Sequence, residues 1–378
     1  MNIYEIVANA PTLYETKTHD NRPQPFLLIG APGVAKSSII EGAFKDALSQ
    51  YLQGPVDVIT EIASTRESPD FRGLGIPVRP QDGSPAYIAY PKPDLCHRVE
   101  NSPALQHPNG LVILFLDELL QSGQDTQKVL CDSILNYRLG EHELPDRTWI
   151  IGASNRQKDG AGVNRPLTIL TNRLASYEVE LPVEYYCRWA RAKGIHPVGI
   201  SFVERFPVWF GQDQPPKEGA FCSYRSFTQA MKAISAWNKI HSKPSTHVEN
   251  NTFISNTITG YIGEGATREF MAFASVVDQL PSRFDILNHP DTTPVPNHDR
   301  IDAQYVAANM AYAIATEPDS PLNMIPAARY LLRLPNKELA VKTVIELNKS
   351  TNGGVLMNNP DIVQFVAKNK ALIMDSVL

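Results

Sequence analysis

The sequence predicts a doubly wound α/β domain that is followed by a mostly helical region. From about Pro25 to Leu181, short apolar runs typical of buried strands alternate with helical patterns. From Ser223 onward, the spacing of apolar residues is mostly helical. The chain has 378 residues, of which 43% are hydrophobic, and this is enough for two packed units.

A lead-in helix is predicted over Met1–Pro11 and the first strand over Phe26–Ile29. A glycine-rich turn follows this strand. After the turn, apolar side chains from Ile39 to Tyr51 recur at helical spacing. A strand, a glycine-rich turn and a Lys-Ser pair that opens a helix are the layout of a phosphate-binding loop, whose backbone N–H groups face phosphates. The turn reads Gly30-Ala31-Pro32-Gly33-Val34-Ala35-Lys36-Ser37-Ser38.

This loop predicts a nucleotide site. Lys36 would neutralise the β- and γ-phosphates, and the Ser37 hydroxyl would ligate Mg²⁺. Ala35 stands where the motif has Gly, and we expect it to fit at little cost because a methyl group is the smallest addition. The alternative is a plain Gly/Pro turn between a strand and a helix.

Two carboxylates end the third predicted strand. Val56–Ile62 is the second strand, and the apolar run Gly110–Leu119 is typical of a strand buried on both faces of a parallel sheet. Its carboxyl end carries Asp117 and Glu118, where open α/β sheets bind ligands. Asp117 could hold Mg²⁺ through its water shell, and Glu118 could deprotonate the attacking water. A solvated Asp-Glu turn is the alternative.

Two further polar residues follow the next elements of the α/β region. The strand Thr148–Ser154 ends at Asn155, which could fix the catalytic water or simply form a turn. A helix predicted over Arg165–Leu174 carries Arg173 and leads into the strand Ser176–Leu181. Arg173 could cap helix carbonyls, or it could stabilise the transferring phosphate in a neighbouring subunit.

Two insertions interrupt the α/β region, which we bound at residues 1–182. The first, at about 76–90, has an Asp82-Gly83 turn between alternating runs and predicts a β-hairpin. The second, at about 138–148, also predicts a short hairpin. Beyond them, residues 183–222 read as a linker that contains a helix over 184–191 and aromatic side chains that bury a domain junction. Residues 223–378 form a helical lid domain with a C-terminal extension, and its main predicted helices are 227–240, 266–280, 302–315 and 338–349.

The order of these parts resembles the AAA+ ATPases and, within them, the MoxR-like group. The resemblance covers nearly the whole chain, although Tyr224 stands where the sensor-2 motif has Pro. It implies that Walker A is Gly30–Ser37, Walker B is Leu114–Glu118, sensor 1 is Asn155, the arginine finger is Arg173 and sensor 2 is Arg225.

The same resemblance implies a five-stranded parallel sheet, ATP and Mg²⁺ as cofactors, and a homo-oligomeric ring that is a hexamer. It also implies that the hairpins line the working face of the ring, where the alternative is a pair of surface ornaments. The client would be a partner protein complex, with a von Willebrand A domain protein as the implied partner.

Composition narrows the function classes. With 35 basic and 40 acidic residues the net charge is −5, which disfavours nucleic acid and anionic membranes as partners. No apolar stretch is long enough to span a bilayer, and Met1–Glu5 shows no secretory signal. The cysteines are far apart and lack CxxC spacing, which favours reduced thiols and a cytoplasmic enzyme.

Three functions are therefore open. The first is an ATPase (ATP and water to ADP and phosphate) that remodels or activates a protein complex. The second is a nucleic-acid motor on the same core, which the charge balance disfavours. The third is a scaffold that binds ATP with little hydrolysis, for which Ala35 is the only support.

Overall fold

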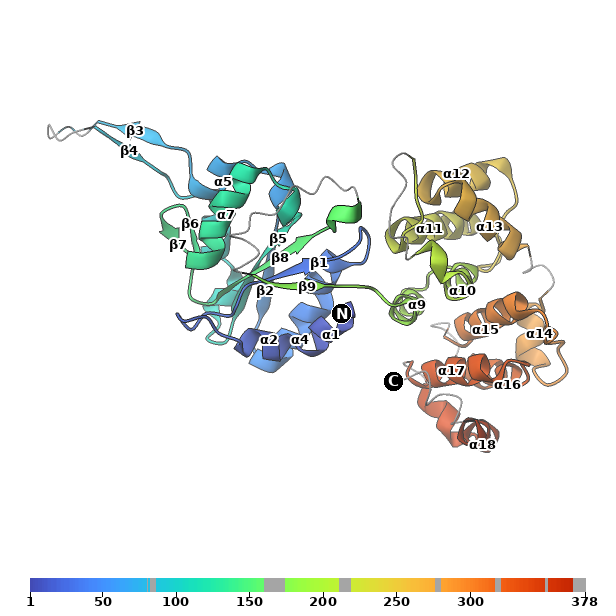
Figure 1. The fold of residues 1–378 in the computed structure, drawn as a ribbon. Helices are drawn as coiled ribbons and strands as arrows, with labels where there is room; N and C mark the ends of the chain where they lie inside the picture. Colours follow the sequence, from blue (N-terminus) through green and yellow to red (C-terminus); the bar gives the residue numbers. More distant parts are fainter. Residues whose placement is uncertain are drawn as a thin grey trace. The chain divides into compact units, whose positions relative to one another are not determined.

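The structure is a computed structural model that describes residues 1–79, 81, 86–159, 174–210, 219–275, 280–316, 321–350 and 353–369. The chain divides into two compact units, shown in Figure 1. The first unit comprises Met1–Leu181, and the second begins at Pro182. Each unit has its own core and is described by itself.

The described part of the first unit holds a five-stranded sheet in the order β2-β5-β8-β1-β9. Every neighbouring pair is parallel, which confirms the predicted doubly wound α/β fold with five parallel strands. Since β8 lies between β1 and β5, the strands that carry the two predicted motifs are next-nearest neighbours. The strands are β1 (Phe26–Ile29), β2 (Val56–Ile62), β5 (Leu111–Asp117), β8 (Thr148–Ser154) and β9 (Ala175–Glu178).

Helices cover both faces of this sheet, as the alternation along β5 requires. Val112, Leu114 and Leu116 belong to one apolar cluster, and Ile113 and Phe115 belong to the other. In Figure 1, α1, α2 and α4 lie on one side of the sheet, and α5 and α7 lie on the other. The first layer is α1 (Ile3–Ala8), α2 (Ala10–Glu15), α3 (Lys36–Ile39) and α4 (Lys45–Leu52); the second is α5 (Ser68–Arg72), α6 (Asp94–Glu100) and α7 (Gln124–Asn136).

The helix predicted after the glycine-rich loop contains a π-helical turn. Helix α3 passes into the π turn Ile40–Phe44 and then into α4. The apolar stripe of this segment is buried at Ile40, Phe44 and Leu48, whereas Tyr51 is 47% exposed. The extra residue of a π turn rotates the face that follows, so a uniform period of 3.6 does not describe the whole segment.

Two short hairpins belong to the first unit. Strands β3 (Ile76–Val78) and β4 (Tyr87–Ala89) pair antiparallel, and the Asp82-Gly83 turn lies outside the described residues. Strands β6 (Arg138–Leu139) and β7 (His142–Glu143) also pair antiparallel. The β3–β4 hairpin carries exposed Ile76, Tyr87 and Ile88, and Figure 1 shows it extending away from the sheet.

The region expected to be a linker with one helix over 184–191 contains that helix and a second one. Within 183–222, the structure has α9 (Val183–Ala192) and α10 (Pro197–Arg205), and both group with the second unit. Every residue from Pro197 to Val203 is buried. Because these first two turns are buried on all sides, they have no exposed face that would mark them as a helix in the sequence.

Phe202, one of the aromatic residues of that region, lies in the core of the helical unit. Phe202 is fully buried, and its ring centroid lies 5.6 Å from that of Phe227 and 5.4 Å from that of Phe270. A second apolar cluster joins the later helices. The remaining helices are α11 (Tyr224–Ile240), α12 (Thr252–Ile262), α13 (Glu264–Ala274), α14 (Arg283–Asn288), α15 (Ile301–Ala315), α16 (Met324–Leu332), α17 (Lys337–Asn348) and α18 (Pro360–Lys368).

None of the helices in the described ranges has both the length and the apolar character that crossing a bilayer requires.

Candidate functional site

The glycine-rich loop joins the end of β1 to the start of α3 at the carboxyl edge of the sheet. Gly30 donates its N–H to the Ser154 carbonyl at 3.2 Å, which fixes the start of the loop against β8. A Cβ at Gly30 would lie 2.7 Å from the Val179 oxygen, so only glycine fits there. Gly33 has φ +81°, a left-handed conformation that opens the loop toward the helix.

Ala35 also adopts the left-handed conformation, with φ +64° and ψ +25°, at the N-cap of α3. This conformation costs a residue with a Cβ about 1–2 kcal/mol more than it costs glycine. The expectation that Ala35 fits at little cost is therefore wrong, because the position needs a positive φ and not only a small side chain.

Lys36 spans the concave side of the loop. Its side chain is largely buried, with 7% of the residue exposed. Its Nζ donates to the carbonyls of Gly30 at 2.8 Å and Ala31 at 3.1 Å, and to Asn155 Oδ1 at 3.0 Å. The ammonium group therefore lies where the loop and the end of β8 converge, and Asn155 is brought to the same point.

The next residue reaches the end of β5. Ser37 Oγ donates to Asp117 Oδ2 at 2.5 Å. The other carboxylate oxygen, Oδ1, accepts the backbone N–H of Glu118 at 2.9 Å. The structure thus brings the predicted metal-binding hydroxyl and carboxylate into contact. Oxygen ligands of this kind are those that Mg²⁺ prefers.

Glu118 is held by a residue that the sequence pattern did not single out. Its backbone is left-handed, with φ +55°, and its Oε2 accepts a hydrogen bond from the Ser64 hydroxyl. Ser64 belongs to the 3-10 turn Ala63–Thr65 directly after β2. Since Ile62 of β2 pairs in register with Asp117, the residues that follow these strands meet at one edge. Only the pairing of β2 with β5 indicates that Ser64 lies at this site, and that pairing must be known before the contact can be predicted.

A buried carboxylate stabilises the turn that carries Ser64. Glu61, which is 6% exposed, accepts from Arg66 Nε at 2.6 Å and from Arg98 at 2.7 Å. Because Arg66 directly follows the 3-10 turn, these ion pairs fix the segment that positions Ser64 opposite Glu118. No motif marks this triad in the sequence.

Of the two remaining predicted site residues, one lies outside the described residues and the other belongs to the second unit. Arg173, the predicted arginine finger, lies outside the described residues. Arg225 is exposed on the first turn of α11, in the second unit, where the Ser223 side chain caps the helix. Beside it, Tyr224 is buried, and its ring stacks on Phe210 with centroids 5.1 Å apart. The residue that replaces the motif's Pro thus packs in the helical core.

No protein-family model matches this chain, and no curated protein matches it. Solved structures match it at low identity. The RuvB Holliday junction branch migration motor of Thermotoga maritima is 12% identical, with a TM-score of 0.38 over 86% of this chain and 87% of that chain. The Aeropyrum pernix ORC1 protein in complex with DNA is 12% identical, with a TM-score of 0.38 over 92% of this chain and 82% of that chain.

NtrX from Brucella abortus is 13% identical, with a TM-score of 0.36 over 98% of this chain and 68% of that chain. All three TM-scores lie below 0.5. The function of this chain is therefore inferred from its own residues and sheet topology.

Proposed function

We propose that this chain binds ATP with Mg²⁺ at the carboxyl edge of its parallel sheet and hydrolyses it. The observation that carries the proposal is the bond between Ser37 Oγ and Asp117 Oδ2, 2.5 Å long and between residues 80 apart in the chain. A hydroxyl and a carboxylate at one point, directly after a loop with two left-handed residues, fit a magnesium–triphosphate group.

Each residue of the cluster then has a defined task. The loop amides bind phosphate oxygens, and Lys36 exchanges its bonds to the loop carbonyls for bonds to the triphosphate. Asn155, which contacts Lys36, orients the attacking water, and Glu118 accepts its proton. Mg²⁺, when bound, offsets the negative charge on the phosphates. Before the nucleotide binds, the Ser64 hydroxyl holds the Glu118 carboxylate.

Loss of the ammonium group tests the loop assignment. We expect Lys36→Ala to abolish ATP binding, because the triphosphate loses its one cationic ligand from the loop. Isothermal titration with ATP and Mg²⁺ measures this, and Lys128→Ala, at a lysine that is 63% exposed on α7, is the control. Unchanged ATP affinity in Lys36→Ala would refute the assignment.

At a finer level, we propose an AAA+ ATPase of the MoxR-like type that forms a homo-oligomeric ring, a hexamer, in the cytoplasm. Arg173 would reach a neighbouring subunit, and Arg225 would sense the γ-phosphate and couple it to motion of the helical unit. The ring would remodel a client protein complex, with a von Willebrand A domain protein as partner. The order of the motifs along the sequence supports this proposal.

A further inference from the structure

The end of β8 lies between the two parts of the proposed site. In the sheet, β8 pairs with β1, which leads into the glycine-rich loop, and with β5, which ends at the carboxylate pair. Ser154 is the last residue of β8, and Asn155 follows it. The side chains of these two residues contact different parts of the site.

Two hydrogen bonds join the end of β8 to the glycine-rich loop. The Ser154 carbonyl accepts the backbone N–H of Gly30 at 3.2 Å. Asn155 Oδ1 accepts from Lys36 Nζ at 3.0 Å. The position of Asn155 relative to the loop is therefore fixed by a backbone contact and by a side-chain contact.

The Ser154 side chain contacts the other part of the site, the turn that follows Glu118. Ser154 is 1% exposed, and its hydroxyl donates to Gln121 Oε1 at 2.7 Å. Its Oγ also lies 3.2 Å from the Asn155 carbonyl, which is a longer contact. Gln121 ends the 3-10 turn Leu119–Gln121, and its backbone N–H donates to the Glu118 carbonyl at 3.0 Å. Two hydrogen bonds in series therefore connect the end of β8 to the backbone of Glu118.

The same turn also packs against β8 through an apolar contact. Gly152 lies two residues before Ser154, so both face the same side of the sheet. A Cβ at Gly152 would lie 3.0 Å from Leu119 Cδ2, and Leu119 is fully buried. Apolar contacts are not directional, whereas a hydrogen bond requires a particular distance and angle. The bond from Ser154 to Gln121 therefore specifies where the turn lies along β8.

We propose that Ser154 and Gln121 are positioning residues for ATP hydrolysis. Their bond fixes Glu118 relative to Asn155, so that one water molecule can contact both side chains. This role rests on the proposed function, in which Asn155 orients the attacking water and Glu118 accepts its proton. Loss of the bond would leave both groups present but less well placed, and a small displacement of a catalytic group lowers the rate strongly.

Steady-state ATP turnover by full-length Ser154→Ala tests this role. We expect kcat to fall about tenfold or more. The dissociation constant for a non-hydrolysable ATP analogue with Mg²⁺ should stay within about twofold of the wild-type value, because the backbone contact with Gly30 is retained. A kcat equal to that of the wild type would overturn the proposal, and so would a loss of affinity as large as the loss of kcat.

A second variant tests the bond itself. Gln121→Leu keeps the approximate size of the side chain but removes the acceptor, so kcat should again fall about tenfold or more while affinity is retained. Since both substitutions break the same bond, adding Ser154→Ala to Gln121→Leu should lower kcat no further. Losses that multiply in the double variant would overturn the proposal. If Ser154→Ala does not fold, kcat and affinity in Gln121→Leu decide the question alone.

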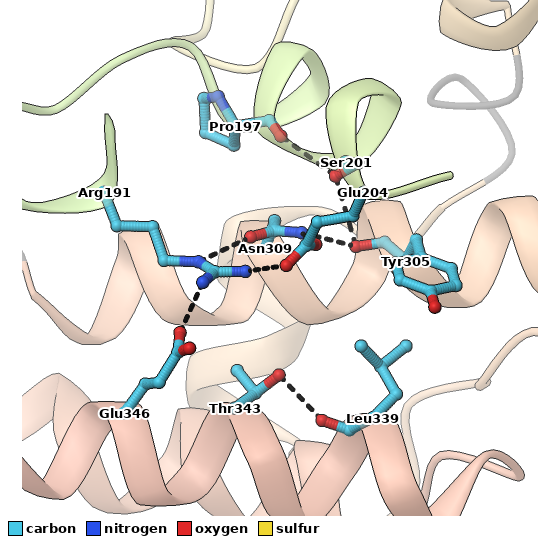
Figure 2. Close-up of polar contacts among 9 residues, drawn as sticks. All are labelled: Arg191, Pro197, Ser201, Glu204, Tyr305, Asn309, Leu339, Thr343 and Glu346. Atoms are coloured by element: carbon cyan, nitrogen blue, oxygen red, sulfur yellow. Dashed lines mark hydrogen bonds and ion pairs between the residues drawn. The ribbon is translucent and has the colours of Figure 1, made fainter. Parts of the chain in front are cut away.

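Ser201→Ala, in the helical unit, is the matched control. Ser201 is fully buried, its hydroxyl donates to the Pro197 carbonyl at 2.9 Å, and the Tyr305 carbonyl lies 3.2 Å from the same oxygen, as Figure 2 shows. Both Ser201→Ala and Ser154→Ala remove a buried hydroxyl, so both should lower the free energy of unfolding in urea. Only Ser154→Ala should lower kcat. An equal fall in kcat in both variants would indicate general destabilisation and overturn the proposal.

The wild type shows which of the two proposals fails. A wild type that hydrolyses no ATP would overturn the proposed function and the positioning role with it. A wild type that hydrolyses ATP, together with a Ser154→Ala variant that hydrolyses it equally fast, would overturn the positioning role alone.

Discussion

At the scale of single residues, Ala35 holds the loop in a backbone conformation that alanine resists. Its φ of +64° lies beside the +81° of Gly33, so two left-handed residues occur within three positions. Paired turns of this kind make the concave array of amides that binds anions. The alanine keeps that geometry and stores strain at the start of α3.

Ala35→Gly should therefore stabilise the protein. Relief of about 1–2 kcal/mol of backbone strain exceeds the flexibility that glycine adds to the unfolded chain, about 0.5–1 kcal/mol. We expect a net gain of roughly 0.5–1 kcal/mol in the free energy of unfolding, measured by urea denaturation. Gly33→Ala should lower it, and a gain in both variants or a loss in Ala35→Gly would contradict this account.

Residues at the site differ in how well the sequence could predict them. Asp117 ends a strand that is otherwise apolar, so its place at the carboxyl edge could be predicted from the pattern alone. Ser64 follows a strand as well, but nothing local distinguishes it from any other serine after a strand. Its contact with Glu118 depends on the pairing of β2 with β5, which is a property of the folded sheet.

At the scale of elements, prediction succeeded where one face of an element is buried or where a strand is wholly apolar. The α/β region has such patterns, and its strands lie close to their expected positions. The sequence does not predict helix α10, because its first seven residues are all buried. It does not predict the π turn Ile40–Phe44 either, because one extra residue barely changes the spacing of the apolar residues in the sequence.

His196, the N-cap residue of α10, should make stability depend on pH. Burial lowers its pKa from 6.5 to about 4, so between these values the unfolded chain binds a proton that the folded chain does not. The contribution of His196 to the free energy of unfolding is complete above pH 6.5 and is lost as the pH falls toward 4. The loss should approach about 3 kcal/mol.

Urea denaturation at pH 7 and at pH values down to about 4.5 measures the loss, as the difference between the wild type and His196→Gln. The variant should lose less stability than the wild type over this window, and His241→Gln, at an exposed histidine, should behave as the wild type. Parallel curves for wild type and His196→Gln would contradict a buried neutral imidazole.

At the scale of the whole molecule, the chain builds two separate cores. The first unit ends at Leu181, one residue from the boundary expected on the sequence. The helical unit was predicted too short because α9 and α10 were assigned to a linker. The fold of each unit could be inferred from local patterns, whereas their spatial relationship and any contact between subunits could not.

Assembly is the prediction that belongs to this scale. We expect a native mass that is a multiple of the 41.9 kDa chain. If Arg173 acts across a subunit boundary, adding Arg173→Ala to wild-type protein should lower ATP turnover more than its share of the mixture, because one variant subunit disables its neighbour. A turnover that falls in simple proportion to the added variant would contradict action between subunits.

The central claim is that one cluster binds the triphosphate while Glu118 accepts the proton of the attacking water. Titration of ATP and Mg²⁺ into Glu118→Gln, with phosphate release followed in the same samples, tests it most directly. We predict binding as tight as that of a non-hydrolysable analogue to the wild type, and phosphate release lower by about 10²-fold or more. Loss of binding, or turnover near that of the wild type, would contradict the claim.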